Sequence, residues 1–256
     1  MKIKSYKIII ALLISVIILQ WLFIFEKHRK AAVTPVAIKG KIAIVLDDWG
    51  YNLHNIPVAS QIKQHFTAAV LPCLAYSRRV ALALKEQGVE IALHLPLEPH
   101  EKYGLEKDTI FTTSSKEEIL RILNEGLVSV KYAKGVTNHM GSRATEDERV
   151  MGIIFGELKQ RNLYFLDNMD TRQSICSIVA RNTGIHFGRR DVFLDNLKNP
   201  EYIKGQLLKL KEKAKRYGWA IGVGHDNKVT LEVLKEAMPQ MEKEGCRFVF
   251  LSELLK

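Results

Sequence analysis

Short runs of consecutive apolar residues recur along the chain beyond residue 41. Apolar residues at consecutive positions are typical of strands that are covered on both faces of a sheet. The predicted strands lie at residues 42–46, 68–71, 91–95, 135–137, 163–166, 185–187, 219–223 and 248–251. Helical stretches lie between them, so strand and helix alternate about seven times. This alternation predicts a parallel α/β sheet, either closed as a barrel or open and doubly wound.

Local signals mark several helix ends. Two pairs fit the capping box, one Asn-Pro pair fits an N-cap followed by proline at the first helical position, and two glycines fit helix stops. These signals are Ser115 with Glu118, Thr145 with Glu148, Asn199 with Pro200, Gly88, and Gly218. They place the predicted helices between the predicted strands.

An apolar run precedes this alternating part of the chain. Residues 8–25 have only Ser15 and Gln20 as polar interruptions, and as a helix they would span about 27 Å, enough to cross a bilayer once. Charged residues follow at once, whereas a cleavable signal peptide would end in small residues. The sequence therefore predicts an uncleaved transmembrane anchor within residues 1–30, a tether over 31–40 and one domain over 41–256.

Composition and charge narrow the class of protein. The 256 residues are 47% apolar and 26% charged, which fits a globular protein and argues against disorder, collagen, a coiled coil or a multi-span membrane protein. The formal net charge is +10, but half of this excess lies within residues 1–30, where it suits phospholipid headgroups better than nucleic acid. We expect the anchor to keep its N-terminus inside and the domain on the extracytoplasmic side of a bacterial membrane.

The cysteines and common motifs exclude several kinds of site. Cys73, Cys176 and Cys246 are far apart and form no C-x-x-C pair, so they indicate neither a disulfide framework nor a zinc knuckle. The glycines near residue 222 lack the third glycine of a dinucleotide fingerprint, and the sequence contains no P-loop, no G-x-S-x-G elbow and no H-E-x-x-H motif. Nucleotide binding and serine-hydrolase chemistry are therefore not predicted.

Titratable side chains stand where most of the predicted strands end. In parallel α/β folds the carboxyl ends of the strands open onto one face, so residues far apart in sequence converge there. Each residue alone could be a solvated loop residue or a helix cap, and Asp48 in particular could cap a helix near residues 52–55. The strand-end residues are Asp47, Asp48, His94, Asn138, His139, Asp167 and His225, with Asp191 and Asp195 after the sixth strand.

Adjacent carboxylates and several histidines indicate metal chemistry. Asp47 and Asp48 follow a buried run, where two carboxylates repel each other and are costly unless a cation or metal compensates them. Pro96 and Pro99 forbid a helix around His94, and in an extended segment Glu98 would lie on the same face as His94. His139 stands beside a glycine-containing turn. A histidine alone is often a satisfied core residue, but together with Asp48 these side chains form a candidate metal-ligand set.

Five motifs, in order, resemble the divergent polysaccharide deacetylase family. The resemblance covers roughly residues 41–256 and implies an irregular (β/α) barrel of about seven parallel strands, the NodB-like deacetylase architecture. It also implies metal-dependent removal of N- or O-acetyl groups from sugars, usually with zinc. The motifs are Val-Leu-Asp47-Asp48-Trp-Gly, Ala-Leu-His94-Leu-Pro-Leu-Glu-Pro, Asn138-His139-Met-Gly-Ser, Tyr-Phe-Leu-Asp167 and Gly-Val-Gly-His225.

The resemblance implies metal ligands, with one departure from the family pattern. Asp48 and His94 match two ligands of the wider carbohydrate deacetylases. The position four residues after the first histidine, where those enzymes have a second histidine, is Glu98 here. Either Glu98 or His139 would then complete the ligand set for Zn²⁺ or another divalent metal, and we favour His139 because it should end the neighbouring strand.

The resemblance also implies catalytic roles. Asp47 would act as general base and take a proton from metal-activated water, whose pKa zinc lowers from about 15.7 towards 7. His225 would act as general acid and protonate the leaving amine or alcohol, with Asp167 or Asp195 orienting its ring. Arg143 and Asp195 are expected at the substrate. The expected partner is an acetylated glycan of the cell envelope, with the metal and a backbone N–H stabilising the oxyanion.

Two other functions remain open at this point. A metal-dependent phosphoesterase also uses carboxylates and histidines at strand ends, and two metals about 3.5–4 Å apart would favour it. A membrane-anchored glycan-binding or scaffold protein could keep the barrel without the chemistry. Glu98 in place of histidine is the best support for that second alternative.

Overall fold

The computed structural model describes residues 13–23, 38–101 and 104–255. The chain divides into two compact units, Met1–Ala37 and Ile38–Lys256. In the first unit residues 13–23 are helical, and the rest of the predicted anchor and most of the predicted tether lie outside the described residues. None of the helices in the described part of the chain has both the length and the apolar character that crossing a membrane requires.

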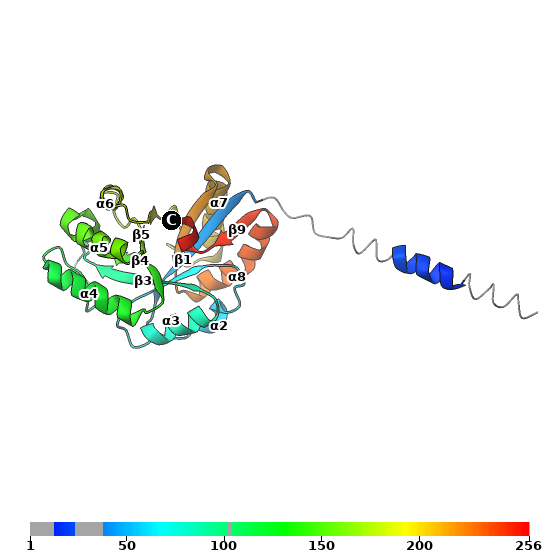
Figure 1. The fold of residues 1–256 in the computed structure, drawn as a ribbon, viewed down its shortest axis with the longest axis horizontal. Helices are drawn as coiled ribbons and strands as arrows, with labels where there is room; N and C mark the ends of the chain where they lie inside the picture. The colour runs from blue at the N-terminus through cyan, green and yellow to red at the C-terminus, as the bar shows by residue number, and fades with distance from the viewer. Residues whose placement is uncertain (1–12, 24–37, 102–103, 256) are drawn as a thin grey trace, which may run out of the picture. The chain divides into compact units, whose positions relative to one another are not determined.

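The second unit is built on one curled parallel sheet (Figure 1). Its strands follow the order β6-β5-β4-β3-β2-β1-β8-β7, with β9 also paired to β1, and all of these pairs are parallel. Within the described residues no ladder joins β6 to β7, so the sheet is an open half-barrel. The strands are β1 Gly40–Trp49, β2 Thr67–Val70, β3 Glu90–Leu97, β4 Ala133–Met140, β5 Tyr164–Asp167, β6 Phe187–Arg189, β7 Val192–Phe193, β8 Trp219–His225 and β9 Cys246–Val249.

Helices cover the outer face of this sheet, and α9 lies within its curve (Figure 1). Alternate residues of β1 divide between two apolar cores, since Ile42 and Ile44 pack with the outer core and Ala43 and Val45 with the inner one. The helices are α2 Ile56–Ala59, α3 Ser77–Glu86, α4 Lys116–Ser129, the 3₁₀ helix η1 Ala144–Glu146, α5 Glu148–Gln160, α6 Cys176–Thr183, α7 Pro200–Tyr217, α8 Lys228–Lys243 and α9 Leu251–Leu254.

Most of the predicted helix ends are confirmed. The side chain of Ser115 accepts a hydrogen bond from the backbone of Glu118, and Asn199 caps α7 ahead of Pro200. The capping box predicted at Thr145 is wrong. Asp147 caps α5, whereas Thr145 lies in η1 and its hydroxyl donates to the carbonyl of Gly141 at 2.8 Å.

The inner core is closed by the segment that follows β9. Leu251 and Leu255 pack inside the sheet with residues of β1, β5 and β8. Beside them the buried carboxylate of Glu90 accepts hydrogen bonds from the Thr67 hydroxyl at 2.9 Å, from the Ser252 backbone N–H at 3.1 Å and from the Ser252 hydroxyl. This polar network lies at the amino end of β3, opposite the end where the candidate site lies.

Candidate active site

The backbone at Asp48 brings two neighbouring carboxylates into one site. Consecutive residues of a regular strand point to opposite faces, but Asp48 has a φ of 64°, in the left-handed region, and the register of β1 shifts between Leu46 and Trp49. Aspartate tolerates this conformation better than most residues. Asp48 does not cap a helix, since α2 begins at Ile56 with Asn55 at its N-cap.

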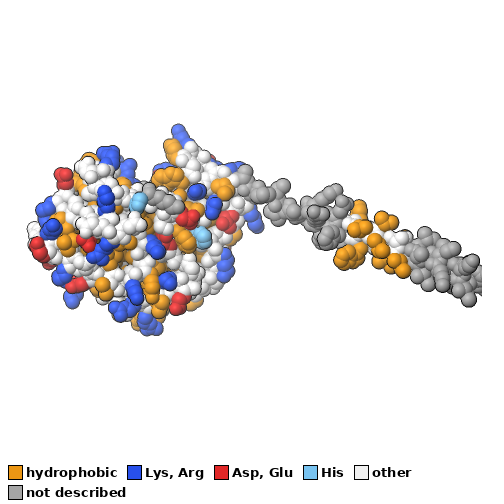
Figure 2. Space-filling view, in the orientation of Figure 1, with side chains coloured by type: hydrophobic (Ala, Val, Ile, Leu, Met, Phe, Trp, Pro, Cys, Tyr) orange, Lys and Arg blue, Asp and Glu red, His pale blue; other side chains and the backbone are white. Residues whose placement is uncertain are grey.

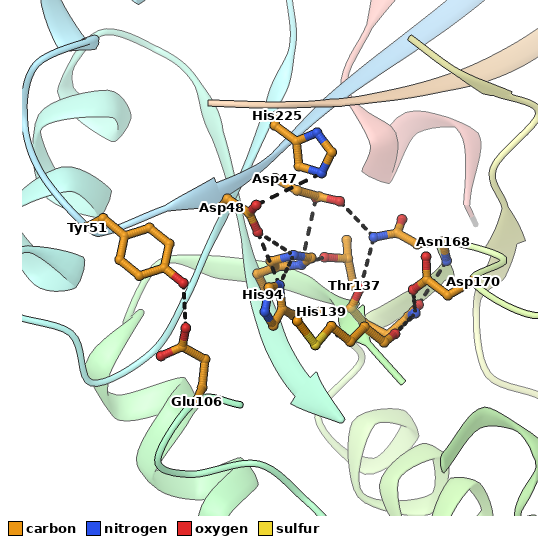
Figure 3. A network of polar contacts seen from close by, with 12 residues as sticks. Asp47, Asp48, Tyr51, His94, Glu106, Thr137, His139, Asn168, Asp170 and His225 are labelled. Atoms are coloured by element: carbon orange, nitrogen blue, oxygen red, sulfur yellow. Dashed lines mark hydrogen bonds and ion pairs between the residues drawn. The ribbon is translucent and has the colours of Figure 1, made fainter. Parts of the chain in front are cut away.

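Three ligand atoms from the carboxyl halves of β1, β3 and β4 form a nearly equilateral triangle (Figure 3). The Asp48 Oδ1 atom lies 3.2 Å from His94 Nε2 and 3.1 Å from His139 Nδ1, and the two histidine nitrogens are 3.2 Å apart. Four tetrahedral donors around zinc, with bonds of about 2.0–2.1 Å, are separated by roughly 3.3 Å. The spacing of the triangle therefore fits a bound Zn²⁺ or a similar divalent cation.

Protons cannot satisfy all three edges of this triangle at once. The Asp48 oxygen only accepts hydrogen bonds, so each histidine nitrogen must carry a proton to bond with it. The two protonated nitrogens of His94 and His139 would then oppose each other across 3.2 Å. A cation accepts a lone pair from all three atoms, so the donor set fits a metal better than a purely hydrogen-bonded network.

The surroundings prepare His94 and Asp48 for metal binding. The Thr137 hydroxyl lies 2.6 Å from His94 Nδ1 and fixes the orientation of the ring, as the outer partners of metal-binding histidines do. Burial lowers the pKa of His94 to about 4, so its imidazole is neutral at pH 7. Burial would raise the pKa of Asp48, but hydrogen bonds with His139 and His94 hold it well below its usual range.

Asp47 lies beside the triangle with one oxygen held and the other free. Its Oδ2 accepts a hydrogen bond from Asn168 Nδ2 at 2.7 Å. In the described residues its buried Oδ1 has no hydrogen-bond partner and lies 3.7 Å from His94 Nδ1. Burial and the neighbouring charge of Asp48 raise the pKa of Asp47 well above its ordinary value. A buried acceptor of this kind is suited to take a proton.

Two buried asparagines orient Asp47. The second N–H of Asn168 Nδ2 donates to the Asn138 carbonyl at 2.9 Å, and the Asn168 backbone N–H donates to Asn138 Oδ1 at 2.8 Å. Asn138 in turn donates to Asp170 at 2.8 Å. The ends of β4 and β5 are thereby tied to the carboxylate at the end of β1.

His225 faces the triangle from the other side. Its Nε2 lies 3.9 Å from Asp48 Oδ2, and its Nδ1 lies 2.9 Å from Asp195 Oδ1. Asp195 is 4% exposed, and it also accepts hydrogen bonds from the His225 backbone N–H and the Thr230 hydroxyl. Burial alone would lower the pKa of His225, but the hydrogen bond with Asp195 and the charge of Asp48 raise it to about 9.

Asp167 and Glu98, which the sequence offered as site residues, have other contacts. Asp167 does not orient His225: its carboxylate accepts hydrogen bonds from the Ser174 hydroxyl and the Met169 backbone N–H. Asp195 makes the contact with His225 instead. Glu98 lies outside the triangle because β3 ends at Leu97 and the chain turns.

Glu98 and Arg143 form a contact of their own. Glu98 accepts from the Thr112 backbone N–H at 2.6 Å and lies 3.3 Å from the guanidinium of Arg143. Arg143 is absent from the linings of the two hollows at the candidate site. Its predicted contact with substrate stays a prediction.

Two adjoining hollows open at the triangle. One, of about 260 Å³, contains the triangle and Asp47, and the other, of about 390 Å³, lies beyond His225. Phe193, Tyr51 and Arg190 line them in addition to the predicted residues. Sequence reasoning missed these three and Asn168, although Asn168 directly follows a strand end and could have been found by the same rule.

The chain matches a family model and a known relative in sequence. A family model described as divergent polysaccharide deacetylase matches residues 44–255. The uncharacterized protein YibQ of Escherichia coli is 35% identical over 205 residues, which is 80% of this chain and 64% of that protein. This chain thus spans less than two thirds of the length of that relative.

Solved structures share the fold. The crystal structure of the uncharacterized protein ATU2773 from Agrobacterium tumefaciens matches with a TM-score of 0.80 at 22% identity, covering 89% of this chain and 94% of that one. A mutant of BA3943, described as a CE4 family pseudoenzyme, matches with a TM-score of 0.51 at 14% identity, covering 88% and 72%. These likenesses identify the curled parallel half-barrel as a NodB-like fold.

Proposed function

Because the chain belongs to the divergent polysaccharide deacetylase family, we propose that it is a metal-dependent hydrolase that removes acetyl groups from a glycan. The observation that carries the proposal is the triangle of Asp48, His94 and His139. It lies between a carboxylate oxygen that is free to accept a proton and a histidine that is held ready to give one.

Each residue of the site has a defined part in this chemistry. Asp48, His94 and His139 would hold the cation, and a bound divalent cation supplies Lewis-acid chemistry by polarising a carbonyl and acidifying water. Asp47 accepts the proton of the attacking water at Oδ1, because its other oxygen is occupied by Asn168. His225 gives a proton from Nε2 to the leaving amine or alcohol.

The hollows support a sugar as substrate. Phe193 and Tyr51 offer aromatic surfaces, and Asn196 and Asn227 offer polar groups in the same lining. An apolar surface with a few convergent polar groups is typical of small-molecule sites. An acetylated glycan of the bacterial envelope is the substrate class we propose, with residues 8–25 as an anchor that holds the domain on the extracytoplasmic side.

The test of this function is acetate release by the full-length protein. After chelation and reloading with Zn²⁺, we expect acetate to be released from N-acetylated chitooligosaccharides or from peptidoglycan, and chelation alone should abolish the release. Glycan binding by zinc-loaded protein without any acetate release, on either substrate, would contradict the hydrolase and favour the scaffold.

The alternatives have less support from the site. The scaffold hypothesis depended on Glu98 replacing a histidine, but the triangle is complete without Glu98. Two metals close together would favour the phosphoesterase hypothesis, whereas one group of His, Cys, Asp and Glu side chains with metal-binding geometry is found among the described residues. Both observations support single-ion deacetylation.

The contact between His225 and Asp195 makes the proposed function dependent on pH. His225 must be protonated to act as an acid, and its pKa is raised to about 9, so kcat should fall as the pH rises through about 9. Asp195→Asn removes the charge that holds the proton on His225. The basic limb of the pH profile, where kcat falls, should therefore move down by about 1–2 pH units. The measurement is the pH profile of kcat at saturating substrate.

Asp191 provides a matched control for this prediction. It lies in the same segment and accepts a hydrogen bond from the backbone N–H of Ile221 in β8 at 2.9 Å, as Asp195 does from that of His225 at 2.8 Å. Asp191→Asn should leave the basic limb in place. An equal shift in both variants would show that the limb does not report the proton on His225.

A further inference from the structure

One end of the sheet, opposite the candidate site, carries exposed cations together with aromatic side chains. Here β1, β8 and β9 begin, and Lys41 lies in register between Trp219 of β8 and Arg247 of β9. Figure 2 shows Lys and Arg side chains beside hydrophobic ones near the start of β1. We call this surface the basic face, and it consists of Lys39, Lys41, Arg216, Tyr217, Trp219 and Arg247.

The cations of the basic face are not neutralised by neighbouring acids. Within the described part of the chain, Lys39, Lys41, Arg216 and Arg247 form no ion pair. Two acids of the adjoining segments are paired with other lysines, Glu212 with Lys215 and Glu244 with Lys211. The face therefore presents a local excess of positive charge to the solvent.

The basic face also exposes aromatic side chains. Tyr217 is 63% exposed and Trp219 is 44% exposed, and the guanidinium of Arg216 lies 5.3 Å from the centre of the Tyr217 ring. Trp and Tyr with an apolar body and a polar tip are enriched where proteins meet the headgroups of a membrane. Lys and Arg beside them attract anionic lipids.

The position of the basic face in the sequence also favours a membrane as its partner. Ile38, itself 57% exposed, directly precedes Lys39 of the basic face. Residues 26–37 alone separate it from the apolar run at residues 8–25, so that run is joined covalently to the domain at this face. A nucleic acid or an acidic protein would satisfy the cations but would not explain the apolar run that precedes them in the sequence.

We propose that the basic face docks on a bilayer surface that contains anionic phospholipid. Docked in this way, the domain holds the carboxyl ends of its strands, and with them the candidate site, away from the lipid. The proposal does not depend on the proposed hydrolase activity, because docking uses none of the site residues. It concerns the folded domain itself rather than the apolar run.

The test follows Trp219 in the full-length protein. Vesicles of phosphatidylcholine with about 30% phosphatidylglycerol carry bromine on the lipid chains near the headgroups, and bromine quenches nearby tryptophan. The emission of Trp219 is the difference between the unchanged protein and Trp219→Phe, which cancels Trp21 and Trp49. We expect this emission to be quenched in the anionic vesicles and restored by raising the salt from about 0.01 M to about 1 M, which shortens the Debye length from about 30 to 3 Å.

Charge reversal on the basic face gives the second measurement. Lys41→Glu with Arg247→Glu should lower the ratio of docked to undocked domain by at least roughly 30-fold, since each cation near an anionic surface contributes about a fivefold preference. The matched control is Lys116→Glu with Lys228→Glu, which changes the net charge equally at the amino ends of α4 and α8. The control should leave the quenching of Trp219 unchanged.

Three results would overturn the proposal. In the first, Trp219 is not quenched in anionic vesicles. In the second, both double variants lose quenching equally, so that only net charge matters. In the third, polyglutamate or DNA shields Trp219 while anionic vesicles do not, and the basic face then binds an acidic macromolecule.

Discussion

Replacing Asp48 by alanine is expected to abolish metal binding and, with it, acetate release. Asp48 Oδ1 is the one negatively charged corner of the triangle, 3.1 and 3.2 Å from the two histidine nitrogens. Without it a divalent cation would have two neutral ligands from this cluster. We expect the zinc affinity of the full-length protein to fall by more than about 100-fold, since even the loss of an outer partner of a ligand costs 10–100-fold.

The measurement is elemental analysis of the purified protein, followed by zinc titration. Asp226→Ala is the matched control, because Asp226 lines the adjoining hollow and accepts a hydrogen bond from Asn55 but does not belong to the triangle. Zinc content should be normal in this control. An unchanged zinc stoichiometry in Asp48→Ala would remove Asp48 from the ligand set and with it the basis of the proposed mechanism.

Replacing Asp47 by asparagine is expected to stop catalysis while the metal stays bound. An asparagine has the same shape, and its amide oxygen can still accept the hydrogen bond from Asn168. The atom in place of the free Oδ1 is then the amide nitrogen, which cannot take a proton from water. Loss of a general base costs about 10²–10⁴-fold. We therefore expect kcat to fall by about that factor, with one zinc per chain as before.

Asp167→Asn makes the same chemical change at a neighbouring strand end. Asp167 is buried, but its partners are Ser174 and Met169 rather than a residue of the triangle. Its kcat should stay close to that of the unchanged protein. If Asp47→Asn kept its kcat, another group would have to accept the proton, and if it lost zinc, Asp47 would be a ligand instead.

The sequence predicted the strands best where the apolar run was long. The runs at residues 42–46, 91–95 and 219–223 all lie inside observed strands, because a strand covered on both faces has no polar position to obscure the pattern. The prediction at 185–187 was shifted, since β6 spans Phe187–Arg189. The two residues of β7 were missed because so short a strand leaves no pattern.

The convergence of the site was predictable, but the partner of His225 was not. Asp48, His94 and His139 all follow from the rule that parallel strands end at one face. Whether Asp167 or Asp195 approaches His225 depends on the order of the strands in the sheet. Because β7 lies next to β8 while β5 lies across the sheet, Asp195 is the neighbour, and the order of residues along the chain does not contain this information.

The backbone conformation at Asp48 was likewise beyond the sequence. A pair of aspartates at a strand end is compatible with two side chains on opposite faces or on one, and only the left-handed φ of 64° decides between them. The same limit applied to Glu98. Alternation along an extended chain placed it beside His94, but β3 ends one residue too early for alternation to continue.

The closure of the inner core has a consequence for synthesis on the ribosome. Thr67 accepts a hydrogen bond from the backbone of Leu251, 184 residues later in the chain. Glu90 likewise accepts one from the backbone of Ser252. A nascent chain therefore leaves these polar groups and the inner apolar surface uncovered until every strand has been translated. Since an incomplete chain of this kind resembles an unfolded one to chaperones and proteases, only chains elongated past residue 255 should escape cellular quality control.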